Sequence, residues 1–323
     1  MKWIKFLFEI DKKPRRGLIA AEWVVMAYCG LTLLLMLFTW TKLPDPEPML
    51  WGRFRFVVST AALWAVYRMV PCRFTIFCRV ALQMALLSWW YPDTYSLNCI
   101  FPNLDPFFAS LEQSVFGFQP ALVFAQQWNA PLWSELMYMS YSSYFLLITI
   151  VASYYFLWRY NEFGRTAFVI LASFYAFYTV YVLLPVTGPQ YYYLAAGLDN
   201  IARGVFPDVG DYFMTHDEMM TMPGYADGPF YQFMVQAHNA GERPTAAFPS
   251  SHVGITFILL LLAWRSGSRR LFWLVLPFLL LMCLSTVYIR AHYAIDIAAG
   301  LVSGLILYSG MQAVYNLAER HAP

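Results

Sequence analysis

The chain has 323 residues, of which 60% are hydrophobic, 19% are aromatic and only 12% are charged. A soluble domain usually carries about 25% charged residues, so this composition excludes an ordinary soluble protein and indicates a membrane protein. The net charge of +2, without a basic run interleaved with aromatic residues, excludes a nucleic-acid partner. The five cysteines have no CxxC spacing, so neither a disulfide framework nor a zinc site is expected.

Long apolar segments recur along the chain, and a membrane-spanning helix needs about 20 such residues. The candidate spans are 18–40, 54–70, 74–91, 132–158, 167–186, 251–264, 271–289 and 293–315. The first is too long for a signal-peptide core and has no clear cleavage site, so we expect it to be retained. The second and third are short and contain or touch arginine. The sixth reaches a useful length only if the polar Ser250-Ser251-His252 belongs to its helix.

Basic residues mark one side of this predicted bundle. They gather at the N-terminus and between alternate spans, whereas residues 81–158 contain no Lys or Arg. Lys and Arg favour cytoplasmic loops, so both termini are predicted to lie in the cytoplasm, with the protein in the cytoplasmic (inner) membrane. Lys42, Arg53 and Arg55, in the first outer loop, are contrary to this pattern.

Two long segments then lie on the outer side. Residues 92–131 are aromatic and punctuated by Pro and Gly, which predicts an interfacial amphipathic segment. Residues 187–249 form an acidic loop, and a loop of this length is usually functional or disordered. The expected organisation is an all-α polytopic bundle in three parts. These are 1–91, a basic segment with accessory spans; 92–131, the interfacial segment; and 132–323, the catalytic core including the outer loop.

Three ionisable residues, His252, His292 and Asp296, lie at the outer ends of predicted spans. Ionisable groups at membrane depth are usually functional, and three at one face favour catalysis over an interfacial role. His292 and Asp296 are four residues apart, so on a helix they share a face. Asp296 can then hold one ring nitrogen of His292 and leave the other as a nucleophile or base.

Anion-binding groups accompany these residues. Pro249 followed by Ser250 and Ser251 predicts a helix start, whose N–H groups and positive dipole end attract phosphate. Arg290 adds a fixed positive charge. Together with the histidines, these residues predict phosphoryl transfer through a covalent phosphohistidine, and this chemistry requires no metal or cofactor.

At these residues the chain resembles a known family. The segment Phe248-Pro-Ser-Ser-His252 is similar to the second signature of the type 2 phosphatidic acid phosphatase superfamily, PSGH. Ser285–Asp296 is similar to the third signature, S-R-x5-H-x3-D. The resemblance implies a six-helix phosphatase-type core, here with extra N-terminal spans. It also implies His292 as the nucleophile, Asp296 as its partner and His252 as the acid for the leaving oxygen.

The chain departs from the family pattern at the phosphate-binding positions. Thr286 stands at the arginine position of the third signature, and Arg290, four residues later on the expected helix, is predicted to replace it. The first signature, K-x6-R-P, is not recoverable, because Gln236 occupies the lysine position relative to Arg243-Pro244. Arg243 or Gln190 is therefore expected to supply part of the phosphate grip.

Other segments favour one branch of the superfamily. The pattern in 184–192, with His-Tyr-x-x-Asp, resembles the inositol phosphorylceramide synthase and sphingomyelin synthase branch, as does the outer segment 103–120. Glu135, Tyr138 and Tyr141 fall near one face of the fourth span. That face is predicted either to contact a lipid headgroup or, for the tyrosines with Tyr144, to form an aromatic belt.

The function predicted from these residues is a lipid phosphatase or headgroup phosphotransferase acting on a phosphorylated lipid at the outer face. A lipid alcohol is the acceptor if the enzyme transfers, and the sequence leaves hydrolysis and transfer open. A transporter or channel is the alternative, but the polar residues gather at one end of the spans rather than at the midplane. A structural protein leaves the two histidines and the aspartate unexplained, and the vanadate-dependent haloperoxidases of the superfamily are soluble.

Overall fold

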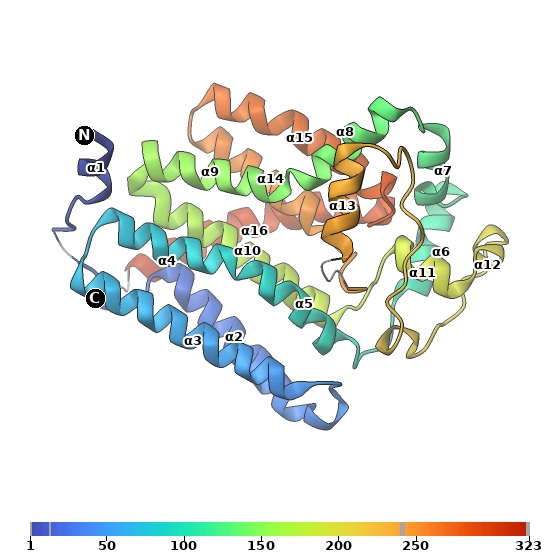
Figure 1. Cartoon of the computed structure of the whole chain (residues 1–323), viewed down its shortest axis with the longest axis horizontal. Helices are drawn as coiled ribbons and strands as arrows, with labels where there is room; N and C mark the ends of the chain where they lie inside the picture. Colours follow the sequence, from blue (N-terminus) through green and yellow to red (C-terminus); the bar gives the residue numbers. More distant parts are fainter. Residues whose placement is uncertain (1, 13, 240–242, 321–323) are drawn as a thin grey trace.

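The computed structural model describes residues 2–12, 14–239 and 243–320, and these residues form helices and no β-strand. Figure 1 shows a bundle with most of its smaller helices at one end and α1 at the other. The helices are α1 (Lys2–Leu7), α2 (Ala20–Phe38), α3 (Pro46–Met69), α4 (Arg73–Ala85), α5 (Leu87–Asn98), α6 (Asp105–Phe116), α7 (Pro120–Gln127), α8 (Pro131–Ser142), α9 (Tyr144–Trp158), α10 (Tyr160–Leu183), α11 (Pro189–Ala196), α12 (Leu198–Ala202), α13 (Pro229–Asn239), α14 (Ser251–Arg265), α15 (Arg269–Tyr288) and α16 (Ala294–Arg320).

Each predicted span coincides with one helix or with two consecutive helices. Four helices, α2, α10, α15 and α16, are long and apolar enough to cross a membrane. The pair α8 and α9 passes the same test together but is bent by 49°, and α14 is apolar but shorter. The polytopic helical bundle is therefore confirmed. The total of about eight spans exceeds these four or five, and for α3, α4 with α5, and α14 it stays a prediction.

Helix α10 is the axis of the bundle. It packs against α2, α5, α9, α14 and α16, and 78% of its most apolar stretch is buried. Its residues from Thr166 to Tyr175 are all buried, so neighbouring helices cover it on every side. A helix that is apolar all round belongs in the centre of a membrane bundle.

The accessory helices bury charges in pairs, which explains why their segments looked poor as spans. Arg53 of α3 donates two hydrogen bonds to Asp93 of α5, at 2.9 and 2.8 Å. Arg79 of α4 pairs with Glu22 of α2, with Nε 2.7 Å from Oε1. All four side chains are almost completely buried. Removing one partner of such a pair leaves an uncompensated buried charge, so the pairs fix how these helices associate.

Glycines allow a close helix contact between α14 and α16. A Cβ on Gly300 would lie 2.6 Å from the Ser250 carbonyl oxygen, and one on Gly304 would lie 2.7 Å from the Gly254 carbonyl oxygen. Gly300 and Gly304 form a GxxxG pattern, which lets helix backbones approach closely in membranes. This contact brings the start of α14 against the start of α16.

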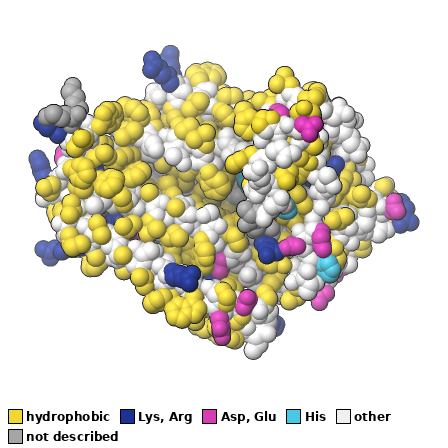
Figure 2. All heavy atoms as spheres, in the orientation of Figure 1, with side chains coloured by type: hydrophobic (Ala, Val, Ile, Leu, Met, Phe, Trp, Pro, Cys, Tyr) yellow, Lys and Arg dark blue, Asp and Glu magenta, His cyan; other side chains and the backbone are white. Residues whose placement is uncertain are grey.

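The remaining short helices, α6, α7 and α11–α13, cover the end of the bundle where α14 and α16 begin (Figure 1). Most acidic side chains on the face in Figure 2 gather at this end, and hydrophobic side chains cover much of the rest. The segment predicted to be interfacial contains α6 and α7, and its Phe108, Ala109 and Ala121 form a second hydrophobic cluster with Tyr193 and Tyr293, apart from the main core.

Candidate active site

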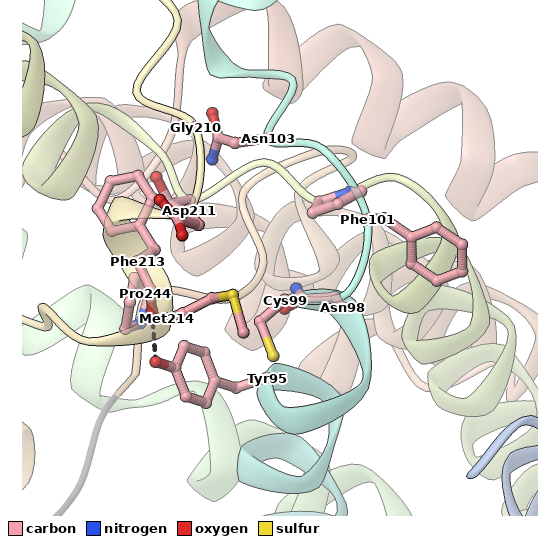
Figure 3. Close-up of a pocket in the computed structure, with 12 residues that line it drawn as sticks. Tyr95, Asn98, Cys99, Phe101, Asn103, Gly210, Asp211, Phe213, Met214 and Pro244 are labelled. Atoms are coloured by element: carbon pink, nitrogen blue, oxygen red, sulfur yellow. Dashed lines mark hydrogen bonds between the residues drawn. The ribbon is translucent and has the colours of Figure 1, made fainter. Parts of the chain in front are cut away.

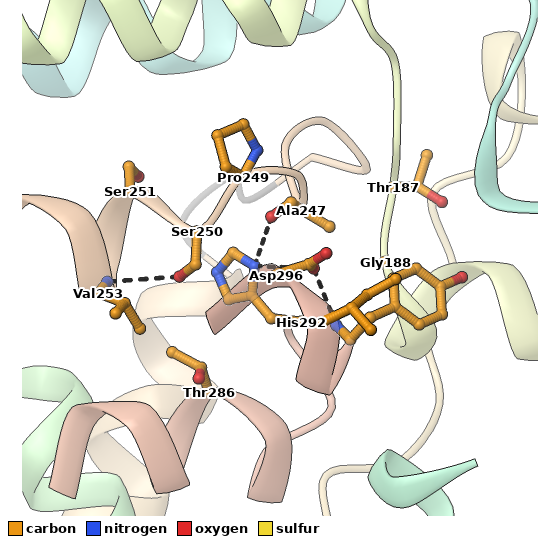
Figure 4. A network of polar contacts seen from close by, with 12 residues as sticks. Thr187, Gly188, Ala247, Pro249, Ser250, Ser251, Val253, Thr286, His292 and Asp296 are labelled. Carbon is orange, nitrogen blue, oxygen red and sulfur yellow. Dashed lines mark hydrogen bonds and ion pairs between the residues drawn. The ribbon is translucent and has the colours of Figure 1, made fainter. Parts of the chain in front are cut away.

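His292 lies in the turn between α15 and α16, so it does not share a helix with Asp296 as expected, although the contact between the two is present. The His292 backbone N–H donates to the Thr286 carbonyl at 3.1 Å. Its Nδ1 lies 2.6 Å from the Ala247 carbonyl oxygen, and the residue is 2% exposed (Figure 4). Because a carbonyl only accepts, Nδ1 carries a proton, and the neutral ring has its lone pair on Nε2.

Asp296 is the second group beside this ring. Its Oδ2 lies 3.5 Å from His292 Nδ1 and accepts the Tyr293 N–H at 2.9 Å (Figure 4). The expected His292–Asp296 contact is thus present, although the Ala247 carbonyl is closer to the ring. Asp296 is completely buried in the first turn of α16, where a carboxylate complements the helix dipole.

His252 lies in the first turn of α14, between two tyrosines of the bent helix pair. Its ring centroid is 4.3 Å from that of Tyr141 in a stacked arrangement and 4.4 Å from that of Tyr144. The His292 centroid lies 5.7 Å away. His252 Nδ1 is buried without a hydrogen-bond partner in the described part of the chain. The two imidazoles, from distant segments, are thus close enough for one phosphoryl group to reach both.

The start of α14 is built as predicted, and several of its N–H groups donate to acceptors within the protein. Ser250 is the N-cap, and its hydroxyl accepts from the Val253 N–H at 3.4 Å. The Ser250 N–H donates to the Asp296 carbonyl at 3.3 Å, and the Ser251 N–H donates to the Tyr181 hydroxyl at 3.0 Å. These contacts fasten α14 to α16 and α10, and phosphate binding at Ser250 and Ser251 stays a prediction.

A narrow hollow with a volume of about 10 Å³, room for about one water molecule, lies over the two histidines. The residues that line it are Tyr91, Tyr141, Thr187, Gln190, Tyr191, Arg243, Thr245, Ala246, His252, Ala291 and His292. Arg243 is the one Arg or Lys among these described residues. Its guanidinium is half-exposed, pairs with Asp217 and lies 6.0 Å from the Tyr95 ring centroid. Arg243 and Gln190, named above for the phosphate grip, thus border the same hollow as the histidines.

Arg290 does not border this hollow. Helix α15 ends at Tyr288, and Arg290 has a positive φ of 67° in the following turn, so it does not share a helix face with Thr286. Its guanidinium donates to the Thr221 carbonyl at 3.0 Å, and its own carbonyl accepts the Gln190 N–H at 2.9 Å. In the structure Arg290 therefore holds the outer loop and the backbone of Gln190.

Asp105 at the start of α6 was not singled out from the sequence, yet it organises one wall of the hollow. Its completely buried carboxylate accepts five hydrogen bonds at 2.6–2.9 Å. The donors are the Asn103 amide, the Thr187 N–H and hydroxyl, the Gly188 N–H and the Tyr293 hydroxyl. The available signal was the polar Asn103-Leu-Asp-Pro106 within an otherwise apolar segment.

Gly188 shows how tightly this wall fits. It has a φ of +90°, and a Cβ there would lie 2.6 Å from the Ala291 carbonyl oxygen. Only glycine adopts such a backbone freely while leaving room for this approach. Asp105 thus holds Thr187 and Gly188 directly against the turn that bears His292.

Glu112, further along α6, contacts the start of α16. One carboxyl oxygen accepts the Ile295 N–H at 3.1 Å, and the other is buried without a partner among the described residues. Burial raises the pKa of Glu112 to about 8, an effect that the hydrogen bond to Ile295 partly offsets and the nearby Asp296 reinforces. Asp105 and Glu112 together attach the outer segment to both sides of the candidate site.

Glu135 and Tyr138 contact protein in the structure. Glu135 accepts the N–H groups of Phe230 at 2.8 Å and Tyr231 at 3.1 Å, at the start of α13. The Tyr138 hydroxyl donates to the Pro223 carbonyl at 2.7 Å. These residues anchor the long outer loop, whereas Tyr141 and Tyr144 of the same segment hold His252.

A second small hollow adjoins the first and shares Thr187 with it (Figure 3). Residues of α5, the 101–103 segment and the 210–214 loop line it, and the Tyr95 hydroxyl donates to the Phe213 carbonyl at 2.5 Å. Its described lining includes Asp211 and neither Lys nor Arg. This hollow is therefore poorly suited to an anion.

A helical membrane bundle with two adjacent histidines and a buried aspartate at one end has the architecture of a phosphatase-type lipid phosphoesterase. Comparison with known families agrees: a family model described as the PAP2 superfamily matches residues 107–309, more than half of the chain. The chain therefore belongs to the PAP2 superfamily. The matched region begins in α6 and leaves α1–α5 outside it. No curated protein and no solved structure matches the chain.

Proposed function

We propose that the protein transfers the phosphoryl-bearing group of a membrane lipid through a covalent intermediate on His292, at the extracytoplasmic face. The observation that carries the proposal is the paired geometry of the histidines. The Ala247 carbonyl fixes the proton of His292 on Nδ1. The ring centroids of His252 and His292 are 5.7 Å apart, and both residues line the same hollow. The distribution of basic residues supports the outward orientation.

The proposed first step forms a P–N bond and breaks a P–O bond. The Nε2 lone pair of His292 attacks phosphorus, and the lipid oxygen leaves with a proton from His252, whose imidazolium forms when the anionic phosphate binds beside it. As positive charge develops on His292, the Ala247 carbonyl and the Asp296 carboxylate stabilise its Nδ1–H. Arg243 and Gln190 are proposed to contact the phosphate oxygens.

The second step decides between phosphatase and transferase. Water or a lipid alcohol attacks the phosphohistidine, His252 accepts the attacking proton, and the P–N bond breaks to restore His292. The 184–192 pattern supports transfer of the inositol phosphorylceramide synthase type, whereas the superfamily as a whole supports hydrolysis.

The test uses purified protein with two phosphorus-labelled lipids, phosphatidic acid and phosphatidylinositol, each with and without ceramide. Water-soluble labelled product indicates hydrolysis, and labelled sphingolipid indicates transfer. Acid-labile, base-stable label on the protein is expected for wild type and absent from His292→Ala. The exposed His216 provides the matched control, and His216→Ala should behave as wild type. Turnover by a folded His292→Ala protein would refute the mechanism.

A further inference from the structure

An apolar groove runs along the membrane-facing side of the bundle between the accessory helices and α9. Its volume is about 1080 Å³, including its open side. The lining residues are Phe77, Val80, Ala81, Met84 and Ala85 of α4, Leu87 and Ser88 of α5, Phe145, Ile148, Thr149, Ala152 and Ser153 of α9, and Phe163 of α10. None of them is charged, and three hydroxyl groups are the only polar side chains in this described lining.

The groove begins one helical turn from the candidate active site. On the accessory side, Ser88 lines the groove and Tyr91 lines the catalytic hollow. On the opposite side, Phe145 lines the groove and Tyr141 lines the hollow and stacks on His252. Ser88 and Tyr91 are three residues apart on α5 and are therefore neighbours. Tyr141 and Phe145 lie on either side of the bend between α8 and α9, where the ring of Tyr144 contacts those of both Phe145 and His252. The two cavities therefore meet at the same level of the bundle.

The length of the groove matches one leaflet of a membrane. From Phe77 to Ser88 the chain follows α4 and α5, which continue almost in line in Figure 1. At 1.5 Å per residue, this stretch is roughly 16 Å long. The hydrocarbon core of a bilayer is about 30 Å thick, so half of it is about 15 Å. Hydrophobic side chains also cover the surface around these helices (Figure 2).

We propose that this groove holds one acyl chain of the phosphorylated lipid while its phosphate lies between His252 and His292. The inference deepens the proposed function by making the donor a long-chain lipid held from the side. It also gives α4 and α5, which lie outside the region matched by the family model, a function in substrate binding. The charge pairs of Arg53 with Asp93 and Arg79 with Glu22 fix the wall that these helices provide.

The test fills the groove with tryptophan from either wall. Thr149 of α9 and Ala85 of α4 are both exposed and line the groove, so Thr149→Trp and Ala85→Trp add bulk outside the packed core. The matched controls are Leu146→Trp on α9 and Ala61→Trp on α3, which are exposed and do not line it. Each variant is assayed with a long-chain phosphatidic acid and with a short-chain, water-soluble analogue.

The expected result is a loss in kcat/KM of about tenfold or more for the long-chain lipid in the two groove variants, with the short-chain rate within about twofold of wild type. Both control variants should keep the wild-type kcat/KM for the long-chain and the short-chain substrate. Equal rates in the groove and control variants, or equal losses on both substrates, would overturn the proposal that the groove holds an acyl chain. Activity of the wild type in the same assay would leave the proposed function intact. If wild type itself turned over neither of these substrates nor labelled phosphatidylinositol, the function and the groove would both fail. If labelling of the protein by long-chain donor stayed at the wild-type rate and only transfer to ceramide slowed, the groove would hold the acceptor and the proposal would be wrong.

Discussion

Replacement of Asp105 tests whether the outer helix α6 shapes the catalytic hollow. Five groups donate hydrogen bonds to the Asp105 carboxylate. Two of them, the N–H groups of Thr187 and Gly188, belong to the backbone and cannot rotate toward another acceptor. The Tyr293 hydroxyl can rotate to serve as an acceptor. Asp105→Asn keeps the shape of the side chain but replaces one accepting oxygen by an NH2 group.

The expected loss in the free energy of unfolding follows from the number of buried donors that lose their acceptor. With its amide oxygen facing Thr187, the asparagine leaves the Gly188 N–H opposite an NH2 group. A buried donor without a partner costs about 1–3 kcal/mol. Asp105→Ala leaves both backbone donors unpaired, which adds to about 2–6 kcal/mol on the same basis. Because Gly188 lies directly against the Ala291 carbonyl, the shift should reach His292.

Two measurements separate this effect from general damage. Thermal unfolding in detergent should show a lower Tm for Asp105→Asn and a still lower one for Asp105→Ala. At a temperature where Asp105→Asn is fully folded, its kcat should fall about tenfold or more, since misplacing a catalytic group by about an ångström costs up to a hundredfold. Asp199→Asn, at an exposed carboxylate on α12, should change neither quantity. An Asp105→Asn protein with the kcat and Tm of wild type would refute the reasoning.

Two further predictions concern the contacts that hold α16. Gly300→Leu should lower both Tm and kcat, because the new side chain would collide with the Ser250 carbonyl, and overpacking of this kind costs about 1–3 kcal/mol. The control is Gly310→Leu, since Gly310 faces open space. Equal Tm and kcat in the two variants would contradict the close contact at Gly300. Burial raises the pKa of Glu112 from its ordinary value of 4.5 to about 8 in the folded protein, so the free energy of unfolding should be greatest below pH 4.5 and fall as pH rises through 8, by at most about 5 kcal/mol. Tm measured from pH 6 to 10 should therefore decline more steeply for wild type than for Glu112→Gln, and parallel curves would show that Glu112 does not titrate in this range.

The parts of the fold that the sequence could predict are those with local causes. Long apolar runs identified the segments of the bundle, and Ser250 before an apolar run identified the start of α14. The two histidine motifs were recognisable because each is compact in sequence. Their meeting in space was predictable only in outline, from the shared outer side of the spans.

The parts that escaped prediction depend on contacts between distant segments. The nearest partner of His292 is the carbonyl of Ala247, 45 residues earlier, and a backbone atom has no residue-type signal. The end of α15 at Tyr288 moved Arg290 away from the hollow, because a helix boundary that is wrong by two residues redirects a side chain completely. Asp105 lies 82 residues from Thr187, so its role required the folded chain.

The phosphate-binding residues are the part of the site where the structure differs most from the sequence-based expectation. Thr286 is buried, and its hydroxyl donates to the Cys283 carbonyl at 3.2 Å, so it cannot supply the charge of the family arginine. Arg243 lines the hollow but is paired with Asp217, and both side chains are about half-exposed. Exposed pairs of this kind contribute only about 0–1 kcal/mol, whereas a charge-assisted hydrogen bond contributes about 1.5–3 kcal/mol. A phosphate that enters the hollow can therefore displace Asp217 from Arg243 at little cost, which makes this pair compatible with substrate binding.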